Sequence, residues 1–220
     1  MTSPRPRAYQ SELRQRQAAE TRQRIVAAAA SLFSELGYPG TTLAKIAERA
    51  QVSVETVQKN GPKAALIRAA VEYTSFGIEG DRDVRDLDVG RAFLALTRPE
   101  QVAPLAAATM RTVNAGSAGV WVALTCAAHS DPELRETFVE FLVAIRRQNE
   151  RMLGVLRDRG WLRTDLGFDQ IVDTWIVLSS VETYVRLRAS GRSDDEYAAW
   201  LERTAAEMLL GRRTTESTIR

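Results

Sequence analysis

Apolar residues recur at helical spacing along nearly the whole chain, and no segment alternates apolar and polar residues as a half-buried strand does. The first helical pattern runs through residues 21–36 and is followed by Gly37, a residue type that often ends helices. Two short patterns follow at 43–50 and 54–59, each preceded by a Thr or Ser that can cap a helix. Three helices, the last two short and joined by a brief turn, predict a helix-turn-helix unit.

Longer helical patterns fill the rest of the chain. A fourth helix opens at Pro62, and the Asp- and Arg-rich segment 80–88 then interrupts the pattern as a boundary loop. Beyond it, start and stop residues predict helices at 100–113, 117–128, 132–159, 168–188 and 193–210. The sequence therefore predicts an all-α protein with three parts: a basic flexible arm at 1–20, a helix-turn-helix domain at 21–68, and a larger helical domain at 69–220.

The last two predicted helices carry more apolar surface than one chain needs. Apolar residues occupy nearly every direction around the helix at 168–188, which predicts burial on two sides. The helix at 193–210 carries a repeating apolar seam with Tyr197, Trp200 and Leu201. A four-helix interface between two copies of this helix pair explains both patterns and predicts a homodimer. A large monomeric core is the alternative.

Composition excludes several classes of protein. The 45% hydrophobic and 26% charged residues are typical of a folded globular protein. A single cysteine, Cys126, excludes an internal disulfide, and a single histidine, His129, excludes a His-based metal site. Residues 1–24 lack the apolar core of a secretory signal, and the longest charge-free run, 112–130, suits a buried helix better than a membrane span. We expect a cytoplasmic protein with no metal, no other cofactor and no membrane partner.

Charge is unevenly distributed along the chain. The overall net charge is +2, but eleven basic and six acidic residues up to Glu72 give the first third +5 and leave −3 for the remainder. A basic end on a slightly acidic body is typical of a protein that approaches nucleic acid, although basic tails are often merely solvated. The arginines of the arm, Arg5, Arg7, Arg14 and Arg16, either enter a narrow minor groove or only add salt-sensitive attraction.

The third helix is the expected DNA reader, because the N-terminal residues of a recognition helix face base edges. Glutamine pairs with adenine, glutamate accepts from cytosine and valine contacts the thymine methyl group. The candidate reading residues are Ser53, Val54, Glu55, Thr56, Gln58 and Lys59. Hydroxyl and ammonium groups near helix N-termini serve as phosphate contacts. The candidates for that role are Thr41, Thr42, Lys45, Thr56, Lys59 and Lys63. The alternative for each is a solvated surface residue.

Four segments together resemble a known family. They read TRQRIVAAAASLFSELGY at 21–38, TTLAKIAERA at 41–50, VSVETV at 52–57 and KAAL at 63–66. They resemble the DNA-binding region of the TetR family of bacterial transcriptional regulators, and GWLRTDL at 160–166 is similar to part of that family's regulatory domain. The resemblance implies a homodimeric repressor that a small molecule releases from a DNA operator. It also implies a phosphate contact for Lys63, which matches a lysine at the start of the family's fourth helix.

The end of the recognition helix departs from the family pattern. The family usually carries a tyrosine after the Thr-Leu/Val pair and an aromatic residue three positions later, where this chain has Gln58-Lys59-Asn60-Gly61-Pro62. This departure favours an alternative, an all-α small-molecule-binding protein whose DNA binding is weakened or lost. An enzyme is disfavoured, because the adjacent residues His129, Ser130 and Asp131 flank a helix break and cannot adopt triad geometry.

A ligand site in the larger domain is expected among apolar faces with a few polar groups. The candidates are Trp121, Thr125, Phe138, Leu142, Met152, Trp175, Ser179 and Glu182. Ordinary core residues are the alternative for all of them. Glu182 lies within an apolar helix, so its carboxylate must face water, a cation or a polar ligand, and an arginine across the dimer interface is an equally good partner.

Overall fold

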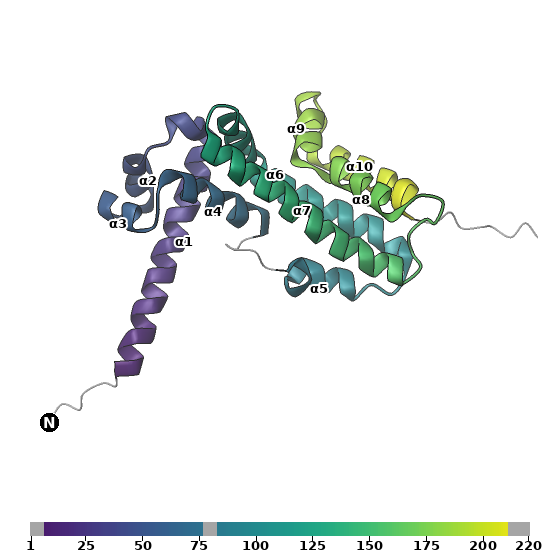
Figure 1. Ribbon diagram of the computed structural model, residues 1–220, viewed down its shortest axis with the longest axis horizontal. Helices are drawn as coiled ribbons and strands as arrows, with labels where there is room; N and C mark the ends of the chain where they lie inside the picture. Colours follow the sequence, from purple (N-terminus) through teal and green to yellow (C-terminus); the bar gives the residue numbers. More distant parts are fainter. Residues whose placement is uncertain (1–6, 77–82, 211–220) are drawn as a thin grey trace, which may run out of the picture. The chain divides into compact units, whose positions relative to one another are not determined.

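The computed structural model describes residues 7–76 and 83–210, with side chains from residue 14 onward, and Figure 1 traces them as a series of helices. The described residues form no β-strand, and one isolated antiparallel bridge among them joins Leu162 to Leu210. The all-α prediction is confirmed. The α-helices are α1 (Arg7–Gly40), α2 (Leu43–Ala50), α3 (Val54–Lys59), α4 (Lys63–Phe76), α5 (Asp88–Leu94), α6 (Val102–Ala128), α7 (Pro132–Asp158), α8 (Phe168–Ser179), α9 (Val181–Ala189) and α10 (Asp194–Leu209). Short 3₁₀ turns occupy Val84–Asp86 and Pro99–Gln101.

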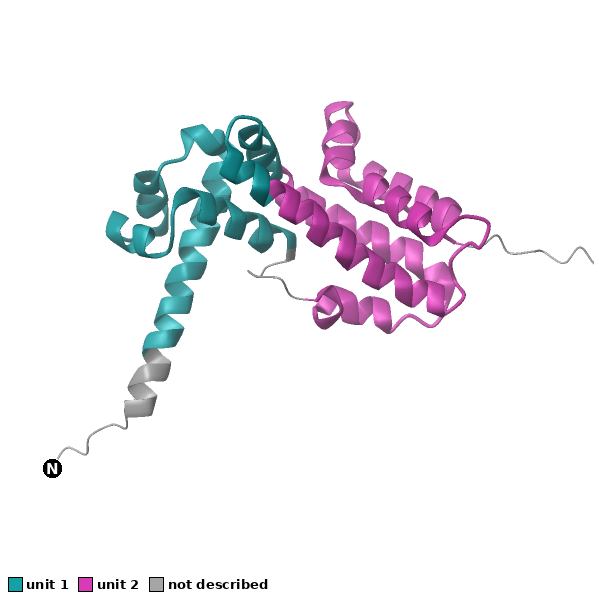
Figure 2. Cartoon of the chain, in the orientation of Figure 1, with its two compact units in different colours: residues 1–80, 119–137 teal, residues 81–118, 138–220 magenta. Residues whose placement is uncertain are grey.

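The chain forms two compact units (Figure 2). Unit 1 consists of residues 1–80 and 119–137, and unit 2 of residues 81–118 and 138–220. The predicted boundary at 68/69 falls inside α4, and unit 1 gains the end of α6 and the start of α7. Periodicity marks where helices start and stop, but it does not say which part of a long helix packs with which neighbours.

Unit 1 is built around α1. This helix packs on α2 and α4, and α2 packs on α3. Its buried face carries Ile25 and Phe33, which meet a core to which α2 adds Ile46, α3 adds Val57 and α4 adds Leu66. The 119–137 stretch adds Trp121, Leu124 and Leu134, all buried. α6 passes α1 so closely that a Cβ on Gly119 would lie 2.6 Å from the Cβ of Ser34.

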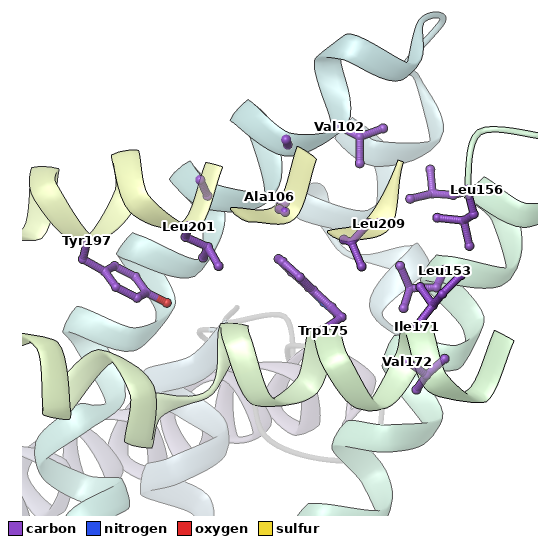
Figure 3. Close-up of a cluster of buried hydrophobic side chains, with 14 of the residues drawn as sticks. Val102, Ala106, Leu153, Leu156, Ile171, Val172, Trp175, Tyr197, Leu201 and Leu209 are labelled. Atoms are coloured by element: carbon purple, nitrogen blue, oxygen red, sulfur yellow. The ribbon is translucent and has the colours of Figure 1, made fainter. Parts of the chain in front are cut away.

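Unit 2 buries its apolar residues in one cluster (Figure 3). Trp175 of α8 lies among residues of α7 and α10, and Tyr197 and Leu201 of α10 are fully buried. Ser193 caps α10 through a capping box with Glu196, since each side chain accepts a hydrogen bond from the other residue's backbone N–H.

Two helices that the sequence predicts as separate form a single helix in the structure. We predicted separate helices at 100–113 and 117–128, but α6 runs unbroken from Val102 to Ala128. The residues that suggested a break are used inside the helix. Asn114 is buried and bonds to other helices, and the Ser117 hydroxyl donates to the Val113 carbonyl at 2.8 Å. Tertiary contacts here outweigh the weak helix propensity of Asn, Gly and Ser.

One helix that the sequence predicts as continuous is divided into two helices in the structure. We predicted a continuous helix at 168–188, but Ser180 takes an extended conformation (φ −64°, ψ 153°) and separates α8 from α9. The break is stabilised from both sides. The Ser180 hydroxyl accepts from the Thr183 N–H at 3.1 Å, and the Asn114 amide donates to the Ser179 carbonyl at 3.0 Å.

The predicted flexible arm is helical from Arg7 onward, while residues 1–6, including Arg5, lie outside the described residues. Residues 7–20 contain no glycine or proline and are rich in helix-forming Ala, Gln, Glu and Arg. The segment lacks an apolar face, which is why hydrophobic periodicity did not detect it. Part of the boundary loop predicted at 80–88 also lies outside the described residues, and helix α5 beyond it was missed.

Candidate nucleic-acid interface

Side-chain caps define the helix-turn-helix. Thr42 accepts from the Lys45 N–H at 3.2 Å and starts α2, and Ser53 accepts from the Thr56 N–H at 3.1 Å and starts α3. Between them, Gln51 ends α2 in the left-handed conformation, with φ 55°. Both caps satisfy backbone donors that a short helix would otherwise leave open. The turn between α2 and α3 therefore follows from local hydrogen bonds.

The far end of α3 is held by α1. Val57 is fully buried against the unit 1 core. The Arg22 guanidinium on α1 donates to the carbonyl of Asn60, the residue that ends α3, and the Asn60 amide donates back to the Thr56 carbonyl at 2.8 Å. These contacts fix both the rotation of α3 and the position of its C-terminal end.

α3 presents its remaining side chains to solvent. Val54 is 40% exposed, Ser53, Glu55, Gln58 and Lys59 are exposed, and Thr56 is half-buried. The surface formed by residues 53–59, which we call the reading face, carries apolar, acidic, amide and cationic groups, the types of group that can contact base edges.

The predicted phosphate contacts have different surroundings. Lys45 is exposed beside the α2 N-terminus, where its Nζ donates to the Gly40 carbonyl at 2.8 Å. Lys63 is half-buried, with its Nζ 4.0 Å from the centroid of the Tyr38 ring, and this burial lowers the pKa of Lys63. The prediction of a phosphate contact for Thr41 needs a correction. The residue is fully buried and its hydroxyl donates to the Gly37 carbonyl at 2.8 Å, so its side chain cannot reach a phosphate.

An ion pair braces α2 on α1. The Arg49 guanidinium donates to both carboxylate oxygens of Glu35, at 2.8 and 3.0 Å, and the Ser31 hydroxyl donates to the same carboxylate. Hydrogen bonds from Arg49 and Ser31 lower the pKa of Glu35 to about 2. The brace keeps the first helix of the helix-turn-helix in place without using a residue of the reading face.

The predicted ligand residues do not form one group within either unit. Trp121 and Thr125 belong to unit 1, and the other six belong to unit 2. Trp175 and Ser179 are buried, Phe138 and Met152 are half-buried, and Leu142 is 44% exposed. Their different surroundings follow from tertiary packing, which helical periodicity does not describe.

Glu182 was predicted within a continuous apolar helix, where its carboxylate must face water, a cation or a polar ligand. In the structure it is exposed in the first turn of α9, and its role stays a prediction. The break at Ser180 creates that helix start, where the helix dipole favours an acidic residue.

The sequence analysis missed a buried hydrogen-bond network in unit 2. Asn114, which is 2% exposed, donates to the Tyr197 hydroxyl at 2.8 Å as well as to the Ser179 carbonyl. Burial raises the pKa of Tyr197 to about 12, against the opposing effect of the Asn114 bond. Next to this network, the Trp175 indole donates to the Asn149 side chain at 2.9 Å. The one available signal was an asparagine inside the apolar run of α6.

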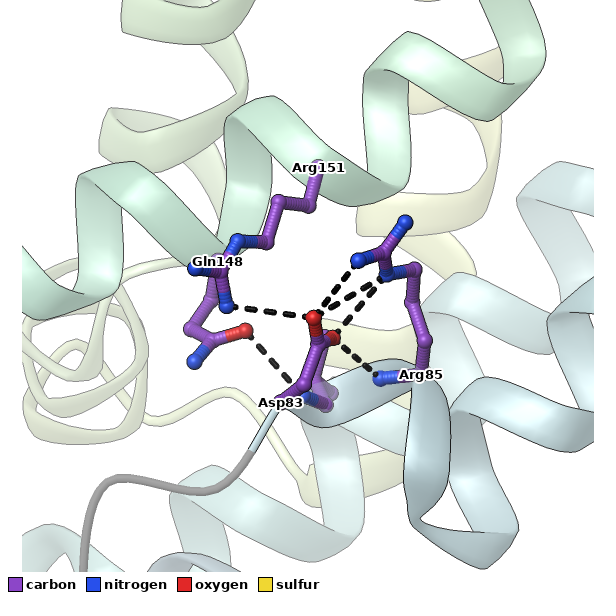
Figure 4. Close-up of polar contacts among 5 residues, drawn as sticks. Asp83, Arg85, Gln148 and Arg151 are labelled. Atoms are coloured by element: carbon purple, nitrogen blue, oxygen red, sulfur yellow. Dashed lines mark hydrogen bonds and ion pairs between the residues drawn. The ribbon is translucent and has the colours of Figure 1, made fainter.

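A second polar cluster anchors the start of unit 2 on α7 (Figure 4). The Asp83 carboxylate accepts from Arg85 at 2.7 Å and from Arg151 of α7 at 3.2 Å, and the Gln148 side chain accepts from the Val84 N–H at 3.1 Å. Hydrogen bonds from Arg85 lower the pKa of Asp83 to about 2. The cluster fixes the 3₁₀ turn that follows the boundary segment.

Two further features concern only the part of the chain that the structure describes. No three of its His, Cys, Asp and Glu side chains gather closely enough to hold a metal ion. None of its helices combines the length and apolar character that crossing a membrane requires. Asp131, one of the three adjacent residues at the helix break, caps α7 by accepting hydrogen bonds from the Glu133 and Leu134 N–H groups.

Comparison with known proteins identifies similar sequences and folds. Residues 25–59 match the family model for bacterial regulatory proteins of the tetR family. A Rhodococcus sp. structure described as a TetR-family transcriptional regulator is 17% identical with a TM-score of 0.70, and the alignment covers 87% of this chain and 99% of that one. The structure of the Bacillus subtilis regulator FadR in complex with stearoyl-CoA is 18% identical with a TM-score of 0.64, and the alignment covers 85% of this chain and 96% of FadR.

A third similar structure is NalD of Pseudomonas aeruginosa, the secondary repressor of the MexAB-OprM multidrug efflux pump. It is 18% identical with a TM-score of 0.60, covering 87% of this chain and 97% of NalD. At these identities the structures establish a shared fold. A search of curated protein sequences found no match.

Proposed function

We propose that this chain, which belongs to the TetR family of bacterial regulatory proteins, is a homodimeric repressor that a small apolar molecule releases from a palindromic operator. The single observation that carries the proposal is the reading face: α3 is capped by Ser53, pinned through Val57 and Asn60, and exposed on its other sides. A short helix held this firmly, with its polar groups left to solvent, suits insertion into a major groove.

The proposed dimer interface involves α8 and α10. The exposed apolar side chains that support it lie on α8 and the neighbouring α7, because the apolar residues of α10, such as Tyr197 and Leu201, are buried within unit 2. Val177 on α8 is 65% exposed and Val143 on α7 is 62% exposed. Helices α7 and α8 run antiparallel, because Arg157 of α7 lies over the Phe168 ring at the start of α8, while Asn149, earlier on α7, bonds to Trp175, later on α8. The Arg146–Asp173 ion pair then sets Leu142 and Val143, about one turn before Arg146, beside Val177, about one turn after Asp173. Four exposed apolar residues, Val139, Leu142, Val143 and Val177, therefore form one patch, which a second copy would bury.

The effector site is proposed within unit 2. Its cluster is apolar except for a few placed polar groups, chiefly the Asn114 amide and the Tyr197 hydroxyl. These mostly apolar surroundings with a few polar groups support an apolar molecule with one polar end as the effector. FadR, which shares the fold, binds stearoyl-CoA, and this supports a lipophilic effector here.

Gel-shift titration against DNA upstream of the protein's own gene tests the proposal. We expect a palindromic site with half-sites ~34–36 Å apart, or a multiple of that spacing, because a twofold dimer presents two readers. Gln58→Ala removes a base contact and should relax base preference at one position per half-site, by about 1–3 kcal/mol. Lys45→Ala, at an exposed candidate phosphate contact outside the reading face, should instead weaken binding to all sequences and lower the salt slope by about 1. An unchanged preferred sequence in Gln58→Ala contradicts the assignment of the reading face.

A thermal-shift screen of lipophilic compounds tests the effector. A ligand that raises the melting temperature should lower operator affinity by roughly 5–150-fold, which corresponds to a coupling of about 1–3 kcal/mol. A compound that stabilises the protein and leaves operator affinity unchanged would argue against control by this site.

A further inference from the structure

The N-terminal part of α1 projects beyond the helices that surround it in unit 1 (Figure 1). All seven residues from 14 to 20 are exposed, so no side of this helical stretch is packed. Short helices without tertiary contacts are only marginally stable in water. The stretch is also strongly basic, because residues 14–24 contain four arginines and one acid, Glu20. An ordered, unpacked and basic helix raises the question of what covers it.

The Arg22 contact orients this helix relative to the reader. Because the Arg22 side chain reaches the end of α3, the side of α1 that carries Arg22 is the side that faces α3. Residues four and eight positions earlier lie on the same side of a helix. Ala18 and Arg14 occupy these positions and are exposed. Glu20 and Arg16 point in other directions, so the side toward α3 carries arginine and no acid.

We propose that the N-terminal part of α1 lies along the DNA phosphate backbone beside the half-site, with Arg14 as its phosphate contact. The inference rests on the proposed function, because it extends the contact made by the reading face. Arg14 is eight residues from Arg22, so it lies ~12 Å further along the helix axis, at 1.5 Å per residue. That distance corresponds to roughly 3–4 nucleotides of backbone at 3.4 Å each.

Other binding modes fit the observations less well. A helix with side chains is about 10–12 Å across, whereas the minor groove is about 6 Å wide, so this part of the predicted arm cannot enter the minor groove as a helix. Residues 14–24 contain no apolar side chain larger than alanine. The stretch therefore lacks the seam that a coiled coil needs and the apolar face that an interfacial membrane helix needs. A polyanionic backbone matches its charge without requiring an apolar surface.

The helix offers matched variants for a test. Arg14→Gln and Ala18→Glu change the side that faces α3, and each lowers the charge by one. Arg16→Gln and Gln23→Glu make the same charge changes on other sides of the same helix. All four positions are exposed, so we expect all four variants to keep the wild-type melting temperature and helix content.

The test uses the full chain and an operator selected with the wild-type protein from random DNA. Gel-shift titrations at 50 and 200 mM salt should show weaker binding for Arg14→Gln and Ala18→Glu, and near-wild-type binding for the other two variants. If each of these two changes stops the helix from neutralising one or two phosphates, the ratio of wild-type to variant affinity should be roughly 3–12-fold smaller at 200 mM than at 50 mM salt. Hydroxyl-radical footprints of the wild type should extend roughly 3–4 nucleotides further than those of Arg14→Gln.

The two proposals fail in different ways. Equal weakening in all four variants would mean that only net charge matters and would overturn the oriented contact. Binding equal to wild type in all four would remove the α1 contact and leave the reading face intact. If the wild-type protein selects no DNA sequence at all, the repressor function and the backbone contact both fail.

Discussion

Replacing Asn114 with alanine tests whether the buried amide holds the core of unit 2 together. The amide donates to the Ser179 carbonyl at 3.0 Å and to the Tyr197 hydroxyl at 2.8 Å, and the residue is 2% exposed. Its loss leaves two buried polar groups short of a partner, at about 1–3 kcal/mol for each unsatisfied group. The Ser179 carbonyl lies at the end of α8, where Ser180 separates α8 from α9, and the Tyr197 ring also contacts Tyr184 edge to face. Neither polar group can therefore easily turn toward water.

We therefore expect Asn114→Ala to lower the free energy of unfolding by about 2–6 kcal/mol. For a chain of this length, that corresponds to a fall in melting temperature of roughly 4–24 °C, measured by differential scanning calorimetry. Tyr197→Phe should cost less, because it removes one of the two bonds. The double variant should fall short of the sum, since both single variants delete the same bond.

Ser117→Ala is the matched control. Ser117 is equally buried on the same helix, but its hydroxyl bonds only to the Val113 carbonyl one turn earlier, so alanine should be nearly neutral. If Asn114→Ala melts within 2 °C of the wild type (~0.5–1 kcal/mol), or if Ser117→Ala is as costly, the long-range bonds are not what stabilises this core.

Three further predictions concern the other contacts. The pKa of Glu35 is about 2 instead of its usual 4.5, so the ion pair with Arg49 stabilises the fold above pH ~4.5 and loses its effect as the pH falls toward 2; Glu35→Gln should therefore lower the urea midpoint at pH 7 and differ less from wild type at pH 3. Gly119→Ala places a Cβ 2.6 Å from Ser34 and should cost about 1–3 kcal/mol in thermal unfolding, and partial rescue by Ser34→Gly would assign that cost to the close approach. Val177→Asp should give a monomer in sedimentation velocity at micromolar concentration, and a wild type that is already monomeric there would remove the dimer.

The charge and aromatic contacts around the reader explain how the unusual end of α3 is accommodated. The sequence lacks the aromatic residues that the family usually carries there, and residues 58–62 are polar, glycine or proline. In the structure, Tyr38 from the end of α1 stacks on Phe33 at 5.8 Å and also lies under the Lys63 ammonium. Arg22 then holds the Asn60 carbonyl. Support for α3 thus comes from α1, whose position relative to α3 no local pattern describes.

The sequence by itself determined the features that depend on neighbours within about four residues. Helical spacing of apolar residues predicted the all-α class, because each helix must bury one side. The caps at Thr42, Ser53 and Ser193 were predictable for the same reason, since each side chain bonds a backbone group three positions away. The assignment of the reading face followed from these two signals and stays a prediction; in the structure most of its side chains are exposed.

Only the tertiary structure decided the features whose partners are distant in sequence. Asn114 bonds residues 65 and 83 positions away, and these bonds allow α6 to continue where propensity favours a break and help α8 to end where periodicity favours continuation. Thr41 was predicted as a phosphate contact because hydroxyls often have that role, but the packing of α1 and α2 buries it. A hydrogen bond or a buried surface lowers the free energy wherever its partner lies, and the position of a distant partner is decided by the packing of the whole unit.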